Sequence, residues 1–254
     1  MHDDYTQERA VQKNRVRRRG IYLLPNLLTT AALFAGFYAI VQAMNLTFDR
    51  AAIAIFAAMV LDGLDGRVAR MTRTQSAFGA EYDSLSDMVS FGAAPALVMY
   101  EWVLRDMDKL GWIAAFVYCA GAALRLARFN TMLDVADKRW FTGIPSPAAA
   151  ALVAGCVFIV DDYNLDPLTV KWWAWFVTIF AGLTMVSNLK YWSGKTINLK
   201  KSVPFLAICL IVLGIALLSY QPAIVLFGGF VAYAISGYVV SGWLFLRRRR
   251  AARG

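Results

Sequence analysis

Long apolar runs separated by short polar connectors dominate this sequence. Residues 27–44 and 202–220 are two examples, and neither contains a charged side chain. A helix of about 20 residues spans the ~30 Å hydrocarbon core of a bilayer. The pattern therefore predicts an all-α fold, a polytopic transmembrane helix bundle of about eight spans. The expected spans cover approximately residues 24–44, 49–70, 81–104, 110–130, 145–161, 167–188, 202–220 and 222–245.

The connectors are too short to hold a soluble domain; residues 105–109 are typical of them. We therefore expect a single transmembrane domain over residues 21–246, with a basic arm over residues 1–20 before it and a basic tail over residues 247–254 after it. Residues 5–19 of the arm could form an amphipathic helix on an anionic membrane surface, and a disordered arm is the alternative.

Composition and charge agree with a membrane protein. Hydrophobic residues make up 59% of the 254 residues and charged residues 17%, which excludes a disordered chain, a disulfide-rich module and a cytosolic dinucleotide-binding enzyme. The net charge is +9, but the basic residues lie at the ends of apolar runs, so no nucleic-acid partner is expected. Of the 26 Lys and Arg residues, 22 fall on the side of the N-terminus. Both termini are therefore predicted to be cytoplasmic.

Four aspartates are unusual because they lie in or beside predicted spans. Asp62 and Asp65 are three residues apart and Asp83 and Asp87 are four apart, so each pair shares one face of its helix. Residues 71–80 between them are few and polar enough to turn the chain. We expect two antiparallel helix ends that point four carboxylates at one another.

Such a cluster needs a cation. One acid costs roughly 2.5–3.5 kcal/mol at the centre of a membrane helix, and packed like charges add repulsion. Ligand sets made only of oxygen select hard cations, and two Mg²⁺ or Mn²⁺ ions would balance four negative charges. Paired metals are the standard arrangement for displacement at phosphorus. The alternative is the proton or cation pathway of a transporter.

Three neighbours of the aspartates fit phosphorus chemistry. Arg70 could neutralise one of the aspartate charges, but we expect it to point at a substrate. Gly66 and Gly79 would let a phosphate approach the backbone closely, although glycine also eases helix packing in membranes.

At these residues the sequence resembles the CDP-alcohol phosphatidyltransferase family. The family signature is D-x-x-D-G-x-x-A-R, eight residues, then G-x-x-x-D-x-x-x-D. Every fixed position is matched, by Asp62, Asp65, Gly66, Ala69, Arg70, Gly79, Asp83 and Asp87. The resemblance implies that the four aspartates hold two divalent metals and that the metals bind the diphosphate of a CDP-activated lipid. It further implies that an alcohol attacks the lipid-side phosphorus, that CMP leaves, and that Asp87 is the general base.

Within this family the chain is most similar to bacterial phosphatidylserine synthases, at residues 25–29, 87–95, 125–130 and 141–147. This similarity implies transfer of the phosphatidyl group of CDP-diacylglycerol to L-serine. It also implies a homodimer in the bacterial cytoplasmic membrane, surrounded by membrane lipids, with its site at the cytoplasmic face. Choline, glycerol 3-phosphate and an inositol compound remain alternative acceptors.

The binding residues outside the signature are less constrained. Pro25 and Asn26 are candidates to border the cytidine pocket, with an ordinary helix start as the alternative. Arg125 and Arg128 lie three apart and could clamp a carboxylate or a phosphate, and the nearby Asn130 favours Arg128. Both arginines could instead be positive-inside residues that only reach the interface. Three further residues flank a helix start where exposed N–H groups could bind an anion. They are Thr142, Gly143 and Ser146. The alternative is that Pro145 simply begins the helix.

Overall fold

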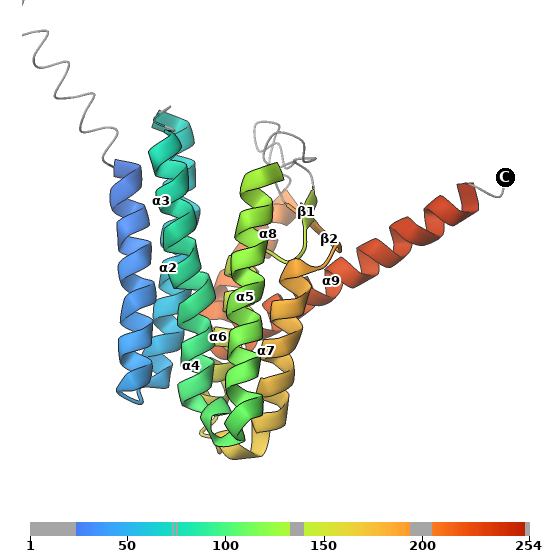
Figure 1. Ribbon diagram of the computed structural model, residues 1–254. Coiled ribbons are helices and arrows are strands. Elements are labelled where there is room, and N and C mark those ends of the chain that lie inside the picture. The colour runs from blue at the N-terminus through green and yellow to red at the C-terminus, as the bar shows by residue number, and fades with distance from the viewer. Residues whose placement is uncertain (1–23, 73, 75, 133–139, 194–204, 252–254) are drawn as a thin grey trace, which may run out of the picture.

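The protein is a helical bundle, seen in a computed structural model that describes residues 24–72, 74, 76–132, 140–193 and 205–251 (Figure 1). The expected arm over residues 1–20 lies outside the described residues. The chain starts with a helix over Leu24–Met44. It continues through α2 (Phe48–Thr72), α3 (Ala77–Asp87), the π-helix η1 (Met88–Ala93), α4 (Ala94–Trp102), η2 (Leu104–Met107), α5 (Asp108–Met132), β1 (Trp140–Thr142), α6 (Ser146–Asp162), η3 (Pro167–Val170), α7 (Lys171–Val186), β2 (Lys190–Trp192), α8 (Phe205–Tyr220) and α9 (Pro222–Ala251).

Helix α6 lies at the centre of the bundle and contacts α2, α7 and α9. Alanine is the most frequent of its buried residues, and this small side chain lets neighbouring helix backbones approach closely. Helices α5 and α7 also cross closely, since a Cβ atom on Gly121 would lie 2.5 Å from the carbonyl oxygen of Gly182. Small residues therefore set the spacing of the helices that carry the site.

Four helices are long and apolar enough to cross a membrane: Leu24–Met44, Leu104–Thr131, Pro167–Val186 and Pro222–Arg247. Together with their exposed apolar side chains they indicate an integral membrane protein. Three other helices are not both long and apolar enough by this measure. Helix α2 is long but carries charged residues, and α6 and α8 have only 17 and 16 residues. The expected count of about eight spans and the cytoplasmic position of both termini stay predictions.

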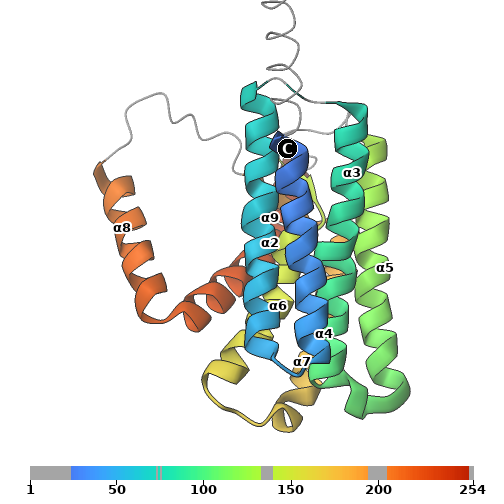
Figure 2. The same cartoon turned by 90° about the vertical axis from the view of Figure 1, so that its left-hand side faces the viewer.

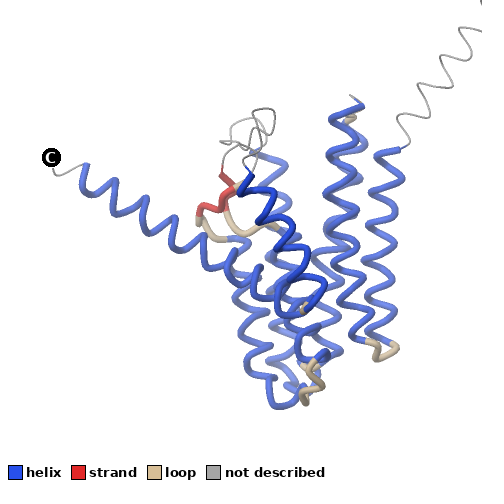
Figure 3. The backbone as a smooth tube through the Cα atoms, turned by 180° about the vertical axis from the view of Figure 1, so that it is seen from behind, coloured by secondary structure: helices blue, strands red, loops and turns tan. Residues whose placement is uncertain are grey.

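Two connectors between the expected spans contain short strands. Strands β1 and β2 form a short antiparallel sheet, with Phe141 opposite Tyr191 (Figure 3). The sheet forms because the segments that precede α6 and follow α7 meet at the same end of the bundle. Gly143 closes this junction with a φ of 78°, a conformation that only glycine adopts without strain.

Helices α8 and α9 form a helical pair at the side of the bundle. Helix α9 packs on α6 and β2 and then extends outward, whereas α8 packs on α9 and stands away from the other helices (Figure 2). Helix α9 continues to Ala251, so part of the expected basic tail is helical.

Candidate active site

The aspartates of α2 and α3 meet between the two helices. Carboxylate oxygens of Asp62, Asp83 and Asp87 all lie within 4.8 Å of one another. Three of the four carboxylates expected to point at one another therefore do so, one from α2 and two from α3. Three carboxylates at this distance repel one another strongly unless a cation or protons lie among them.

Asp65 takes a different position at the edge of this cluster. It is 5% exposed, and its Oδ2 accepts a hydrogen bond of 2.7 Å from the hydroxyl of Thr29, on the Leu24–Met44 helix. It remains close enough to Asp62 and Asp83 for their charges to interact. Thr29 was not among the predicted site residues. The signal that could have identified it is its place in residues 25–29, one of the segments that carry the family resemblance.

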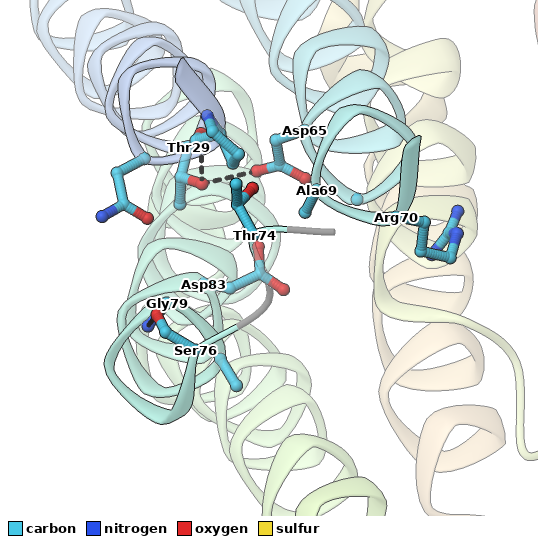
Figure 4. A pocket seen from close by; sticks show the side chains of 12 residues that line it. Thr29, Asp65, Ala69, Arg70, Thr74, Ser76, Gly79 and Asp83 are labelled. Atoms are coloured by element: carbon cyan, nitrogen blue, oxygen red, sulfur yellow. Dashed lines mark hydrogen bonds between the residues drawn. The ribbon is translucent and has the colours of Figure 1, made fainter. Parts of the chain in front are cut away.

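A cavity of about 380 Å³ opens beside the aspartates (Figure 4). The residues that line it come from the Leu24–Met44 helix, α2, α3 and the turn between the last two. Eight of them were predicted from the sequence: Pro25, Asn26, Asp65, Gly66, Ala69, Arg70, Gly79 and Asp83. Four were not: Thr29, Thr74, Ser76 and Ala80. Asp62 and Asp87 do not line this cavity.

The first turn of α3 forms one wall of the cavity. Ser76 caps the helix and accepts a hydrogen bond of 3.0 Å from the backbone N–H of Gly79. A Cβ atom on Gly79 would lie 3.1 Å from Ser76 Oγ and 3.5 Å from Asn26 Oδ1. Because Gly79 has no side chain, a ligand can reach the positive end of the α3 dipole.

Arg125 is a buried cation beside the aspartates. Its side chain is 8% exposed, and Nη1 donates a hydrogen bond of 2.8 Å to Ser146 Oγ. Nε is buried and has no hydrogen-bond partner among the described residues. Arg125 interacts electrostatically with Asp87 and Asp62. The structure thus brings two predicted acceptor residues, Arg125 and Ser146, together next to the cluster.

The other predicted acceptor residues have protein partners. Arg128 donates to the carbonyl oxygens of Val186 (2.7 Å) and Ser187 (3.2 Å), and so holds the C-terminal end of α7. Asn130 exchanges hydrogen bonds with Ser84 on α3. These contacts join helices around the site.

The segment before α6 also forms hydrogen bonds with other parts of the protein. Thr142 accepts a hydrogen bond from Lys190 Nζ at 2.8 Å. The backbone N–H groups of Gly143 and Ile144 donate to the carbonyls of Leu189 and Thr184. Of the residues expected to offer a free N–H group to an anion, Gly143 therefore has its N–H bound within the protein.

Comparison with known proteins agrees with the geometry. The family model of the CDP-alcohol phosphatidyltransferases matches residues 22–183. This chain belongs to that family. The match contains both aspartate pairs, the cavity and Arg125, and ends within α7.

Three relatives of the chain carry the name CDP-diacylglycerol–serine O-phosphatidyltransferase. The protein of Helicobacter pylori strain 26695 is 38% identical over 227 residues, 89% of this chain and 93% of the relative. That of Mycobacterium leprae is 37% identical over 171 residues, 65% of this chain and 55% of the relative. That of Methanocaldococcus jannaschii is 39% identical over 137 residues, 54% of this chain and 61% of the relative.

CDP-alcohol phosphatidyltransferases generally depend on a divalent metal, and the residues of this chain fit one. The cluster offers only carboxylate oxygens, the ligand type that Mg²⁺ and Mn²⁺ prefer.

Proposed function

We propose that this protein transfers the phosphatidyl group of CDP-diacylglycerol to L-serine and releases CMP. The observation that carries the proposal is the buried Arg125 beside the aspartate cluster, in a chain whose relatives are named for this reaction. The cluster suits phosphoryl transfer, and the buried guanidinium suits an acceptor that carries a carboxylate.

The cavity is the proposed place of the nucleotide part of the donor. Asn26 would contact the cytidine, and Arg70 and the first turn of α3 would face the diphosphate. The small side chains of Gly66, Ala69 and Gly79 leave room for it. The diacylglycerol part would stay in the lipid that surrounds the exposed apolar helix faces.

Asp62, Asp65, Asp83 and Asp87 are the proposed metal ligands. Two Mg²⁺ or Mn²⁺ ions, when bound, would neutralise charge on the diphosphate and make CMP a better leaving group. Asp65 would be oriented for this role by Thr29, in the way that outer hydrogen bonds orient metal ligands.

Asp87 is the proposed general base. As the serine hydroxyl oxygen forms its bond to the lipid-side phosphorus, the bond from that phosphorus to the CMP oxygen breaks. Asp87 takes the hydroxyl proton, and CMP leaves with the electron pair. A carboxylate is a weak base for an alcohol, so proton transfer must accompany the attack.

Arg125 is the proposed anchor of the serine carboxylate. Its Nη1 is held by Ser146, and its Nε is buried without a partner among the described residues. A buried unpaired donor costs free energy, and a carboxylate oxygen would satisfy it. Arg128, Asn130 and Thr142 are proposed to support this site indirectly, since each already binds another part of the protein.

Acceptor competition tests the proposal. Purified protein is incubated with labelled CDP-diacylglycerol and, in turn, serine, choline, glycerol 3-phosphate and inositol, and the lipid products are separated. We expect phosphatidylserine and release of CMP that depends on serine. If another lipid is the main product, the alcohol that it contains is the acceptor in place of serine. If CMP is released with none of the alcohols, the proposed reaction is overturned.

We further propose that the site opens at the cytoplasmic face of a bacterial inner membrane and that the protein is a homodimer. The distribution of Lys and Arg supports the orientation. The family resemblance supports the dimer. Labelling of an engineered cysteine at Ser76 from either side of sealed vesicles tests the first, and cross-linking in membranes tests the second.

A further inference from the structure

The helical segment that carries Asp87 contains a π-turn directly after this residue. The π-helix η1 covers Met88–Ala93, and the N–H of Ala94 bonds to the carbonyl of Val89, five residues earlier. Turns of this type are rare and frequently lie at functional sites. The extra residue changes by about 100° the direction of side chains before the turn relative to those after it.

Pro95 explains why the turn is wide. In an α-helix the carbonyl of Phe91 would accept a hydrogen bond from the N–H of residue 95, but proline has no N–H and its ring crowds that carbonyl. Proline is otherwise well placed here, in the first turn of α4. The sequence of residues 87–95 therefore disfavours a continuous α-helix.

Tyr118 supplies a side-chain donor to this carbonyl. Its hydroxyl donates a hydrogen bond of 3.0 Å to the carbonyl oxygen of Phe91. Both residues are 0% exposed, so water cannot replace this bond. Tyr118 lies on α5, two turns before Arg125.

The segment is also fixed on its other side. The Ser86 hydroxyl donates to the carbonyl of Thr29, and the Ser90 hydroxyl donates to the carbonyl of Ala32. These bonds tie the residues on either side of Asp87 to the Leu24–Met44 helix, whereas Tyr118 ties the π-turn to α5. Three hydrogen bonds therefore hold the backbone on either side of Asp87.

We propose that Tyr118 is a positioning residue: it holds the π-turn made by Pro95 and thereby sets the direction of Asp87 toward Asp62 and Asp83. This inference rests on the proposed role of Asp87. It assigns no contact with a substrate to Tyr118. Loss of the hydroxyl should therefore slow turnover and leave substrate binding unchanged.

The first test compares Tyr118→Phe with Tyr191→Phe in the full-length protein. Tyr191 is a matched control, because its side chain is also 0% exposed and its hydroxyl also donates to a helix carbonyl, that of Ala234 at 2.9 Å. We expect kcat of Tyr118→Phe to fall about 10- to 100-fold, with both KM values within about twofold. We expect kcat of Tyr191→Phe to stay within about twofold. An unchanged kcat in Tyr118→Phe, or an equal loss in both variants, overturns the inference.

The second test adds Pro95→Ala, which provides an N–H at residue 95 for the Phe91 carbonyl. Tyr118→Phe should lower Tm less in the Pro95→Ala background than in the wild type, because the carbonyl then has another donor. Additive changes in Tm would contradict the proposed link. If Tyr118→Phe does not fold, the double variant should still fold, and its failure to fold also overturns the inference.

The two proposals fail in different ways. Full turnover in Asp87→Asn would show that Asp87 is not the general base. The Tm values of the Tyr118→Phe and Pro95→Ala variants would still test the link between these two residues. Additive Tm changes would remove the role of Tyr118 but leave the reaction and its acceptor unchanged.

Discussion

Thr29 and Asp65 are 36 residues apart in the sequence, yet the Thr29 hydroxyl donates to Oδ2 of Asp65 at 2.7 Å. Both side chains are buried. The bond joins the Leu24–Met44 helix to α2 at the edge of the aspartate cluster, and both residues line the cavity. The first helix thus takes part in the site through a residue that carries no charge.

Thr29→Val tests the importance of this bond. Valine keeps the shape of threonine but cannot donate, so Asp65 loses its orientation. We expect apparent affinity for Mg²⁺ or Mn²⁺, measured as the metal concentration for half-maximal activity, to weaken about 10- to 100-fold. Thr30→Val is the matched control, since Thr30 bonds to Tyr82 and does not line the cavity. Equal metal dependence of the two variants would contradict the role given to Thr29.

Asp87→Asn should fold normally and lose turnover. Asparagine keeps the shape of the side chain but cannot take the hydroxyl proton, and removal of a general base typically costs about 10²–10⁴-fold in rate. The measurement is kcat with purified protein, with Tm as the check of folding. Glu101→Gln, at a residue paired with Arg105, should retain wild-type kcat. Substantial residual turnover in Asp87→Asn would remove the general-base role.

Chelation should abolish activity, because the carboxylate cluster then holds no cation to neutralise the diphosphate. Activity is measured in EDTA and again after addition of excess Mg²⁺ or Mn²⁺, and either ion should restore it. Ca²⁺, which is larger and takes more ligands, should restore less. Full activity in EDTA would exclude the two-metal proposal.

The sequence predicted the helical membrane fold and the aspartate cluster because both rest on strong local signals. A run of apolar residues has few structural alternatives, and carboxylates within such runs are costly enough to be informative. Asp62 with Asp65 and Asp83 with Asp87 also share helix faces by spacing alone. The number of spans is harder to predict from the sequence. Charged residues interrupt the apolar pattern in α2, and helices such as α6 are short for a membrane span.

The features that the sequence did not predict depend on contacts between segments far apart in the chain. The Thr29–Asp65 bond links two helices whose relative rotation no periodicity determines. Strands of three residues, such as β1 and β2, are too short to show an alternating pattern. The spacing of Arg125 and Arg128 puts both on one side of α5. Their different surroundings follow from the placement of α6 and α7, which the sequence pattern does not reveal.

The two arginines therefore give the most discriminating prediction. Arg125→Gln should raise KM for serine about tenfold or more and leave KM for CDP-diacylglycerol within about twofold, because a bond from a charged donor to a carboxylate is lost. Arg125→Lys should recover only part of this loss, since an ammonium keeps the charge without the fork of donors.

Arg128→Gln is the comparison, and stability is its main readout. Arg128 binds the carbonyls of Val186 and Ser187, so its loss should lower Tm by removing a partner from the C-terminal end of α7. Its KM for serine should stay within about twofold of wild type. If instead Arg128→Gln raises KM for serine while Arg125→Gln does not, the carboxylate anchor is Arg128, as the nearby Asn130 had suggested from sequence. In that case the burial of Arg125 beside Asp62 and Asp87 serves only to balance charge.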